Sequence, residues 1–407
     1  MKPIRLAVIF DQPIQSGGSY QQTLNAALLT HDLVDASVEV VFFTTLKENI
    51  TPLAEHNIKA QLIHLSLLHK VNMHFRRAIL NPRLLIAIKR FQRHTPFEAQ
   101  LIREKIDLVY FISQTAWARS LEELNYIATV WDTCHRDDPE FPEVRWNRTL
   151  ETRDKNNQAI LPRATAIFVE SELGRHHIVQ RYGIDEARVH VMPLQAALAT
   201  RVYAASDTVD STTDIREQYR LDTPYVFYPA QFWAHKNHVY LLNGLKALEE
   251  RHGITIGAIF SGSDKGNRQH VQNRARELGL ADRVRFIGFV PNEQIPQLYR
   301  QSIALVMPTY FGPTNLPPLE AFTLGVPVLY SDKPGLREQV GDAGLLMDLT
   351  NPESMAHHLK TLIEDTQLRD RLIQAGYARL AYFDAVDRSS VLRAVLHDFR
   401  SKRLCWA

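Results

Sequence analysis

The chain alternates between short apolar runs and longer amphipathic segments. In the first half, apolar runs of strand length occupy residues 4–10, 38–44, 106–112, 126–130, 166–169 and 189–192. The segments between them are long enough to hold helices, and Leu24, Ala27 and Leu28 recur at helical spacing after the first run. Because buried strands that alternate with helices pack as a parallel sheet, this pattern predicts a doubly wound α/β domain.

The second half repeats the pattern. Its apolar runs lie at 225–228, 256–260, 284–287, 303–307 and 326–330, and helical periodicity follows at 352–363, 368–381 and 389–404. Residues 196–214, rich in Ala, Ser, Thr and Asp, have the composition of a linker. We therefore expect an N-terminal domain over 1–195, a C-terminal domain over 215–384 and a last helix within 385–407.

Composition narrows the class of protein. The 407 residues suit two domains of ordinary size, and a formal net charge of +2 is too near neutral to argue for nucleic acid. Cys134 and Cys405 lie far apart and give neither a disulfide framework nor a zinc spacing, which suits a cytoplasmic protein. No apolar run approaches the roughly 20 residues that span a bilayer.

One segment, residues 67–94, has a different composition. It holds seven Lys or Arg residues and no acidic residue, interleaved with apolar positions, and Pro82 should divide it into two amphipathic helices. One interpretation is peripheral contact with an anionic membrane surface. The alternative is a pair of surface helices with a basic solvated face. No aromatic stacking pattern accompanies the charge, which argues against nucleic acid.

The stretch 307–330 carries the strongest candidate chemistry. Gly312 and Pro313 end an apolar run, and Asn315 is a good N-cap for a short helix. A loop from the carboxyl end of a strand into a helix N-terminus binds anions, because free N–H groups and the helix dipole point at the same place. Glu320, just inside this helix, would repel a phosphate unless it binds neutral hydroxyls such as a ribose diol. The alternative is a plain βαβ crossover whose prolines shape a turn.

Two glycine-containing loops follow other predicted strands. Gly17 and Gly18 come after the first strand, where paired glycines let the backbone approach a ligand closely or merely form a turn. Gly262 and Ser263 follow the run 256–260 and are expected at the same edge of the second sheet.

Polar side chains follow two further strands. Asp132 and His135 lie in a polar, aromatic loop after 126–130, where they could take part in chemistry or, alternatively, cap a turn and form local hydrogen bonds. Lys236 lies at a predicted helix start after 225–228. The helix dipole disfavours a cation there, which makes an anionic partner more plausible than a plain surface lysine.

The stretch 307–330 resembles the nucleotide-sugar signature of the family-4 retaining glycosyltransferases. That resemblance implies the GT-B fold, with two Rossmann-like doubly wound domains that face each other across a cleft and a C-terminal helix that returns to the first domain. The family carries two glutamates eight positions apart. Glu320 matches the second, which implies ribose binding, whereas Gly312 stands at the first, whose carboxylate touches the donor sugar in the family.

Two other family positions match in part. After the strand at 225–228 the family has an Arg and, five residues later, a Lys on the donor diphosphate; Lys236 matches and Gln231 replaces the Arg. After 126–130 it often has a His-Asp pair; Asp132 matches and Trp131 replaces the His. The resemblance implies Lys236, Asp132 and His135 as catalytic candidates. The donor-binding candidates are Glu320, Asn315, Thr314, Leu316, Gln231, Gly262, Ser263, Gly17 and Gly18.

The expected function is a retaining sugar transfer from a nucleoside-diphosphate sugar to a glycan or lipid-linked acceptor, in surface polysaccharide or lipopolysaccharide synthesis. The sequence contains no Asp-x-Asp pair, so we expect neither a metal nor another cofactor. Two alternatives remain: a catalytically silent nucleotide-sugar-binding subunit, suggested by the departures at Gly312, Gln231 and Trp131, and a nucleotide-sugar epimerase of the same architecture.

Overall fold

The computed structural model describes residues 2–14, 18–33, 37–66, 94–206 and 214–406, which form two compact units. Unit 1 comprises residues 1–133, 151–192 and 387–407, and unit 2 comprises 134–150 and 193–386. The basic segment 67–94 lies outside the described residues except for its last residue, so its membrane interpretation stays a prediction. Across the described ranges, no helix has the combined length and apolarity that crossing a bilayer requires.

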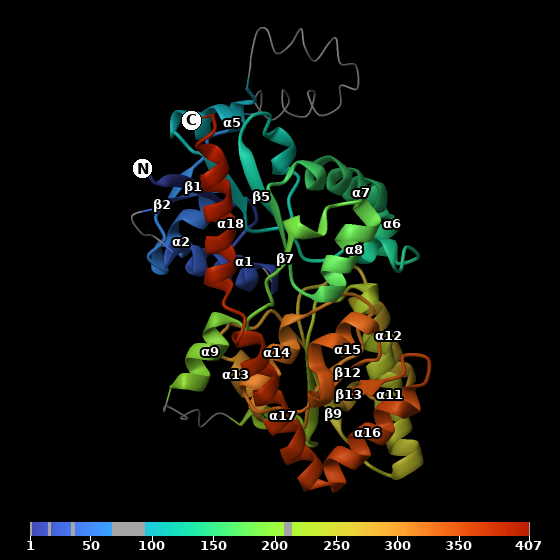
Figure 1. Ribbon diagram of the computed structural model, residues 1–407. Coiled ribbons are helices and arrows are strands. Elements are labelled where there is room, and N and C mark those ends of the chain that lie inside the picture. The colour runs from blue at the N-terminus through green and yellow to red at the C-terminus, as the bar shows by residue number, and fades with distance from the viewer. Residues whose placement is uncertain (1, 15–17, 34–36, 67–93, 207–213, 407) are drawn as a thin grey trace. The chain divides into compact units, whose positions relative to one another are not determined.

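Unit 1 is built on a parallel seven-stranded sheet in the order β3-β2-β1-β4-β5-β6-β7. Its strands are β1 (Ile4–Phe10), β2 (Val38–Thr44), β3 (Ala60–Leu62), β4 (Leu108–Phe111), β5 (Asn125–Val130), β6 (Ala166–Val169) and β7 (Val189–Val191). Its helices are α1 (Gly18–His31), α2 (Ile50–Glu55), α5 (Pro96–Arg103), α7 (Thr149–Ile160), α8 (Glu172–Tyr182) and α18 (Arg388–Arg403). Strands β4 and β6 are buried at every position, as expected for strands covered on both faces. The last helix, α18, packs against α1 (Figure 1).

Unit 2 is built on a parallel six-stranded sheet in the order β10-β9-β8-β11-β12-β13. Its strands are β8 (Tyr225–Pro229), β9 (Gly257–Ser261), β10 (Val284–Gly288), β11 (Leu305–Met307), β12 (Val328–Ser331) and β13 (Gly344–Met347). Its helices are α6 (Pro142–Arg145), α9 (Leu198–Ala205), α10 (Ile215–Gln218), α11 (His238–His252), α12 (Arg268–Glu277), α13 (Ile295–Arg300), α14 (Leu316–Thr323), α15 (Pro334–Val340), α16 (Pro352–Glu364) and α17 (Thr366–Asp384). The two sheets confirm the expected α/β class with two Rossmann-like, doubly wound parts.

The boundaries between the units differ from those expected from composition. Residues 134–150, which we call the arm, follow β5 in sequence but pack within unit 2. The arm holds α6 and ends where Asn147 and Arg148 adopt left-handed φ values of 51° and 57°. The expected linker 196–214 contains α9, which packs against α13 and α14; residues 207–213 lie outside the described ranges. A stretch rich in Ala and Thr can therefore form an ordered helix when a neighbouring surface buries one of its faces.

Candidate functional site

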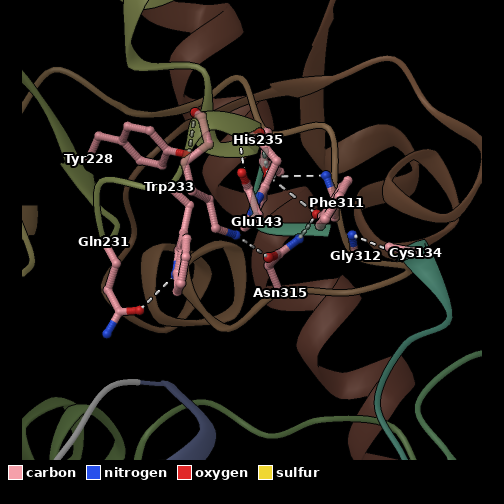
Figure 2. Close-up of polar contacts among 11 residues, drawn as sticks. Cys134, Glu143, Tyr228, Gln231, Trp233, His235, Phe311, Gly312 and Asn315 are labelled. Atoms are coloured by element: carbon pink, nitrogen blue, oxygen red, sulfur yellow. Dashed lines mark hydrogen bonds and ion pairs between the residues drawn. The ribbon is translucent and has the colours of Figure 1, made fainter. Parts of the chain in front are cut away.

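The loop from β11 into α14 depends on Gly312. This residue has φ +109°, a conformation that residues with a side chain rarely adopt. A Cβ added there would lie 2.6 Å from Asn315 Nδ2 and 2.7 Å from the Thr314 carbonyl oxygen. The Gly312 N–H donates to Cys134 Sγ at 3.2 Å (Figure 2). The position that carries a glutamate in the resembling family therefore has a backbone that does not accommodate one.

Asn315 is the N-cap of α14, as expected, but it caps the helix without a side-chain hydrogen bond. Its Nδ2 donates instead to Tyr330 Oη at 2.6 Å, and its backbone N–H donates to Gln339 Oε1 at 2.9 Å. Because Pro317 and Pro318 have no N–H, the first turn of α14 offers fewer donors to an anion than an ordinary helix would. A cation close to this turn therefore matters more.

Lys236 supplies that cation. Its Nζ donates to Asn315 Oδ1 at 3.2 Å, and its carbonyl accepts from Tyr228 Oη at 2.9 Å. The residue ends the 3-10 turn Ala234–Lys236, which Asn237 follows in a left-handed conformation. The structure thus brings together two residues that are 79 positions apart and that the sequence had placed on one predicted diphosphate site.

The loops after β8 and β9 pack closely on each other. Gly262 has φ +133°, and a Cβ there would lie only 2.4 Å from the Ala230 carbonyl oxygen. The Ser263 carbonyl accepts from the Phe232 N–H at 3.0 Å. Gln231, between these contacts in the chain, accepts from Trp233 Nε1 at 3.0 Å (Figure 2). Gln231, Gly262 and Ser263 therefore lie together at the carboxyl end of the sheet, and Gly262 is required by the close approach of the two backbones.

Glu320 lies on α14, with part of its side chain exposed and the rest enclosed by protein. Burial raises the pKa of its carboxyl to about 7, although a hydrogen bond from Tyr299 Oη at 2.9 Å works in the opposite direction. Leu316, at the start of the same helix, is buried and Thr314 is partly exposed. The carboxyl group is thus held on the helix that carries the predicted anion site, which is compatible with the expected contact to a ribose.

The two catalytic candidates from the loop after β5 fall in different units. Asp132 belongs to unit 1, where its carboxylate pairs with Arg153 at 2.7 Å. His135 belongs to the arm in unit 2 and is fully buried. Gly18 is the first residue of α1, and Gly17 lies outside the described residues. The roles assigned to these four residues stay predictions.

The arm contributes a group of contacts that sequence reasoning did not find. Glu143 Oε1 accepts from the His235 backbone N–H at 3.0 Å and lies 2.5 Å from His235 Nδ1 (Figure 2). The His235 ring stacks on Phe311 with centroids 4.1 Å apart and an interplanar angle of 10°. Burial of Glu143 tends to raise its pKa, but the hydrogen bonds from His235 outweigh that effect and lower it. The carboxylate is therefore charged at neutral pH.

A second carboxylate of the arm is also paired within unit 2. Asp138 Oδ2 lies 2.9 Å from Lys333 Nζ, and this ammonium group also lies 5.0 Å from the centroid of the Tyr310 ring. The sequence predicted a functional loop after β5 from its polar and aromatic residues, and that function stays a prediction. The partners of Glu143 and Asp138 are more than 90 positions away, so spacing could not identify them.

Comparison with known proteins shows what this part of the chain is similar to. Residues 211–379 match the family model described as glycosyl transferases group 1. The range contains Lys236, Gly262, Asn315 and Glu320, so these donor-site candidates fall inside the matched region.

Relatives and solved structures extend the likeness. O-antigen chain mannosyltransferase B of Escherichia coli is 26% identical over 248 residues, which cover 60% of this chain and 63% of that protein. Anabaena Alr3699/HepE, solved with UDP and glucose, superposes with a TM-score of 0.72 at 17% identity, covering 97% of this chain and 100% of that one. WaaG, described as a glycosyltransferase involved in lipopolysaccharide biosynthesis, gives a TM-score of 0.65 at 14% identity, covering 97% and 99%. The structural likeness establishes a GT-B-type fold for this chain.

Proposed function

We propose that the protein is a retaining glycosyltransferase that moves a sugar from a nucleoside-diphosphate sugar to a glycan or lipid-linked acceptor. The observation that carries the proposal is the contact of Lys236 Nζ with Asn315 Oδ1 at 3.2 Å, at the N-terminus of the helix that carries Glu320. A cation and a helix N-terminus together suit a diphosphate, and the neighbouring carboxyl group suits the adjoining ribose.

In this proposal Lys236 offsets the charge that develops on the leaving β-phosphate, which is where a transferase lowers the barrier. Among the described residues, no cluster of three or more His, Cys, Asp or Glu side chains is arranged to hold a metal ion. The proposal places the donor diphosphate on Lys236 and on the N-terminus of α14. Departure of the nucleotide and attack of the acceptor on one face of the sugar would give retention without a protein nucleophile.

The acceptor class is proposed from the relatives. One has O-antigen chain mannosyltransferase as its name, and WaaG is described by its role in lipopolysaccharide biosynthesis. Because O-antigen and lipopolysaccharide chains are built on lipids, a lipid-linked acceptor at the inner face of the cell membrane is the corresponding proposal. The expected cytoplasmic location and the membrane role of residues 67–94 belong to the same proposal.

A thermal-shift screen of UDP, GDP, ADP and dTDP sugars, followed by a donor-hydrolysis assay, tests this function. A donor present at a hundredfold above its dissociation constant should stabilise the protein by about 2.7 kcal/mol. Stabilisation by one nucleotide sugar together with its hydrolysis or transfer supports the proposal. Failure of every nucleoside diphosphate sugar to bind the folded protein would refute it.

The backbone at Gly312 favours a second candidate, a silent nucleotide-sugar-binding subunit. The resembling family uses a glutamate there to contact the donor sugar, and the φ of +109° excludes a simple replacement. The same screen separates the two functions. Binding without hydrolysis or transfer, tested with lipid extracts and oligosaccharides as acceptors, would favour the silent subunit.

A further inference from the structure

Glu143 connects the arm to the turn that carries Lys236. A single carboxylate oxygen, Oε1, accepts from the backbone N–H of His235 and pairs with its ring Nδ1. Two interactions with one residue restrict both its main chain and its ring orientation. The Glu143 and His235 side chains are only about one-tenth exposed, at 10% and 11%, so water competes weakly for these contacts.

His235 directly precedes Lys236 and is fixed from a second side. Its carbonyl accepts from the Tyr310 N–H at 2.9 Å, while the Lys236 carbonyl accepts from Tyr228 Oη. The 3-10 turn Ala234–Lys236 is thus held between Glu143 of the arm and the loop that follows β11. A displacement of His235 would move the Lys236 backbone, and with it the ammonium group near Asn315.

The arm also contacts the neighbouring loop directly. Phe141 packs edge-on against Phe311, with centroids 5.2 Å apart and an interplanar angle of 88°, and Phe311 also stacks on the His235 ring. Cys134 Sγ accepts from the Gly312 N–H (Figure 2). The arm therefore reaches both loops that form the predicted diphosphate site, and all these residues belong to unit 2.

We propose that Glu143 is a positioning residue of the donor site, which acts through His235 to hold Lys236 where the diphosphate binds. Position 312 provides no carboxylate, so the acid that organises these two loops comes from the arm. The proposal rests on the proposed function, because it takes Lys236 as the cation on the diphosphate. Glu143 itself touches neither the diphosphate nor the sugar in this account.

Paired nucleotides provide a test that does not depend on turnover. UDP carries the β-phosphate that Lys236 would bind and UMP lacks it, so the ratio of their affinities reports the position of Lys236; GDP and GMP are measured in parallel. Misplacing a charged contact by about 1 Å is enough to lose much of its effect. Glu143→Ala should therefore weaken diphosphate binding about tenfold while changing monophosphate binding by less than about twofold.

Three further variants separate positioning from folding. Glu143→Gln keeps an acceptor oxygen for both His235 donors and should recover most of the diphosphate affinity. Glu140→Ala removes an exposed carboxylate of the same arm and should leave both affinities unchanged. The double variant Glu143→Ala/Lys236→Ala should bind UDP no more weakly than Lys236→Ala alone, because residues that act through one contact are not additive.

Several outcomes would overturn the proposal. An equal loss of UDP and UMP affinity in Glu143→Ala would indicate a general structural role, as would additive losses in the double variant. Unchanged affinities in a folded Glu143→Ala protein would exclude any role. If the wild type binds a diphosphate but transfers no sugar, the proposed transfer fails while the positioning test still stands. If it binds none of UDP, GDP, ADP and dTDP, both proposals fail.

Discussion

The two sheets place different polar side chains at their carboxyl ends. In unit 1, Asp11 follows β1 and accepts a hydrogen bond from Ser113, which follows β4, while Asp132 follows β5 and pairs with Arg153. Burial raises the pKa of Asp11, partly offset by hydrogen bonds from Ser113 and Thr115. Acidic side chains thus collect at the edge of this sheet.

In unit 2 the corresponding loops converge on a cation. Lys236 contacts Asn315, which in turn bonds to Tyr330 and Gln339. Two parallel sheets of one topological class therefore present acids on one unit and an ammonium group with a helix N-terminus on the other. In the proposed function, an anionic donor would be bound by the cation, and carboxylates could accept hydrogen bonds from the hydroxyls of a neutral acceptor. Within the proposed function, unit 2 would bind the donor and unit 1 would bind the acceptor.

The largest expected effect tests the cation of unit 2. Lys236→Ala should lower kcat by about 10² to 10³-fold, the loss typical of removing one donor that stabilises transition-state charge. Nucleotide binding should fall much less, because Glu320 and α14 remain. Steady-state kinetics with the donor found in the screen, together with calorimetric titration of the nucleotide, separates the two effects.

Lys246→Ala is the matched control for that variant, since Lys246 lies on α11 and pairs with Glu249 and Glu250 at the surface. It should leave kcat unchanged. Equal losses of kcat and of ground-state nucleotide affinity in Lys236→Ala would contradict a transition-state role.

Glu320 should make the stability of unit 2 depend on pH. Its pKa of about 7 in the folded protein lies above the ordinary 4.5, so between those values the folded state binds more protons than the unfolded state. The free energy of unfolding contributed by this group therefore falls as pH rises from about 4.5 to about 7. The difference between the two pKa values corresponds to roughly 3 kcal/mol of unfolding free energy. The actual contribution is smaller, because the Glu320 side chain is partly exposed.

His238, in the same unit, should have the opposite effect on the pH dependence of stability. Burial lowers its pKa from 6.5 to about 3, so its contribution to stability rises with pH between those values and is complete above 6.5. Glu320→Gln should remove the decrease in stability with pH that Glu320 causes. The free energy of unfolding of the variant should therefore rise more steeply than that of the wild type between pH 4.5 and 6.5, and should be higher at pH 8. Urea unfolding across this range measures it, with the exposed Glu293→Gln as control. An unchanged profile would show that Glu320 titrates normally.

How far the sequence predicted this arrangement depends on the distance between partners. Apolar runs predicted most strands of both sheets, because burial of a parallel strand leaves a local pattern. They did not predict the short edge strands β3 (Ala60–Leu62) and β13 (Gly344–Met347). The turn at Lys236 and the helix at Asn315 were also predicted, since each has its own strand, loop and helix signals. That Asn315 bonds to Tyr330 and Lys236 rather than capping α14 by its side chain could not be predicted, because it depends on packing across the sheet.

The arm shows the limit of this reasoning more clearly. Nothing in residues 134–150 marks a change of unit, and the pairing of Glu143 with His235 joins positions 92 apart. The sequence alone shows that Gly312 replaces the glutamate of the resembling family. That its backbone conformation is suited to glycine, with the N–H bonded to Cys134, required the three-dimensional structure.

A smaller effect is expected from substitutions at Gly312. Gly312→Ala should lower the free energy of unfolding by roughly 1–3 kcal/mol, because the residue would be held in a sparsely populated conformation. Gly253→Ala is a matched control: it also has a positive φ, of +65°, but its added Cβ would meet nothing within 4 Å. Gly312→Ala should therefore cost more than Gly253→Ala, and Gly312→Glu should not increase activity. Urea unfolding measures both losses of stability. Equal losses in Gly312→Ala and Gly253→Ala would mean that the loop at Gly312 accommodates a side chain without strain.

The smallest expected effect concerns the acidic edge of unit 1. The side chains of Asp132 and Arg153 are 31% and 27% exposed, so Asp132→Asn should change the free energy of unfolding by less than about 1 kcal/mol. If unit 1 binds the acceptor, the variant should raise the KM for the acceptor and leave nucleotide affinity unchanged. Glu186→Gln, which disrupts a surface pair with Arg175, is the control and should change neither. A lower nucleotide affinity in Asp132→Asn would indicate that Asp132 contacts the donor. It would contradict the proposal that unit 1 binds the acceptor and unit 2 the donor.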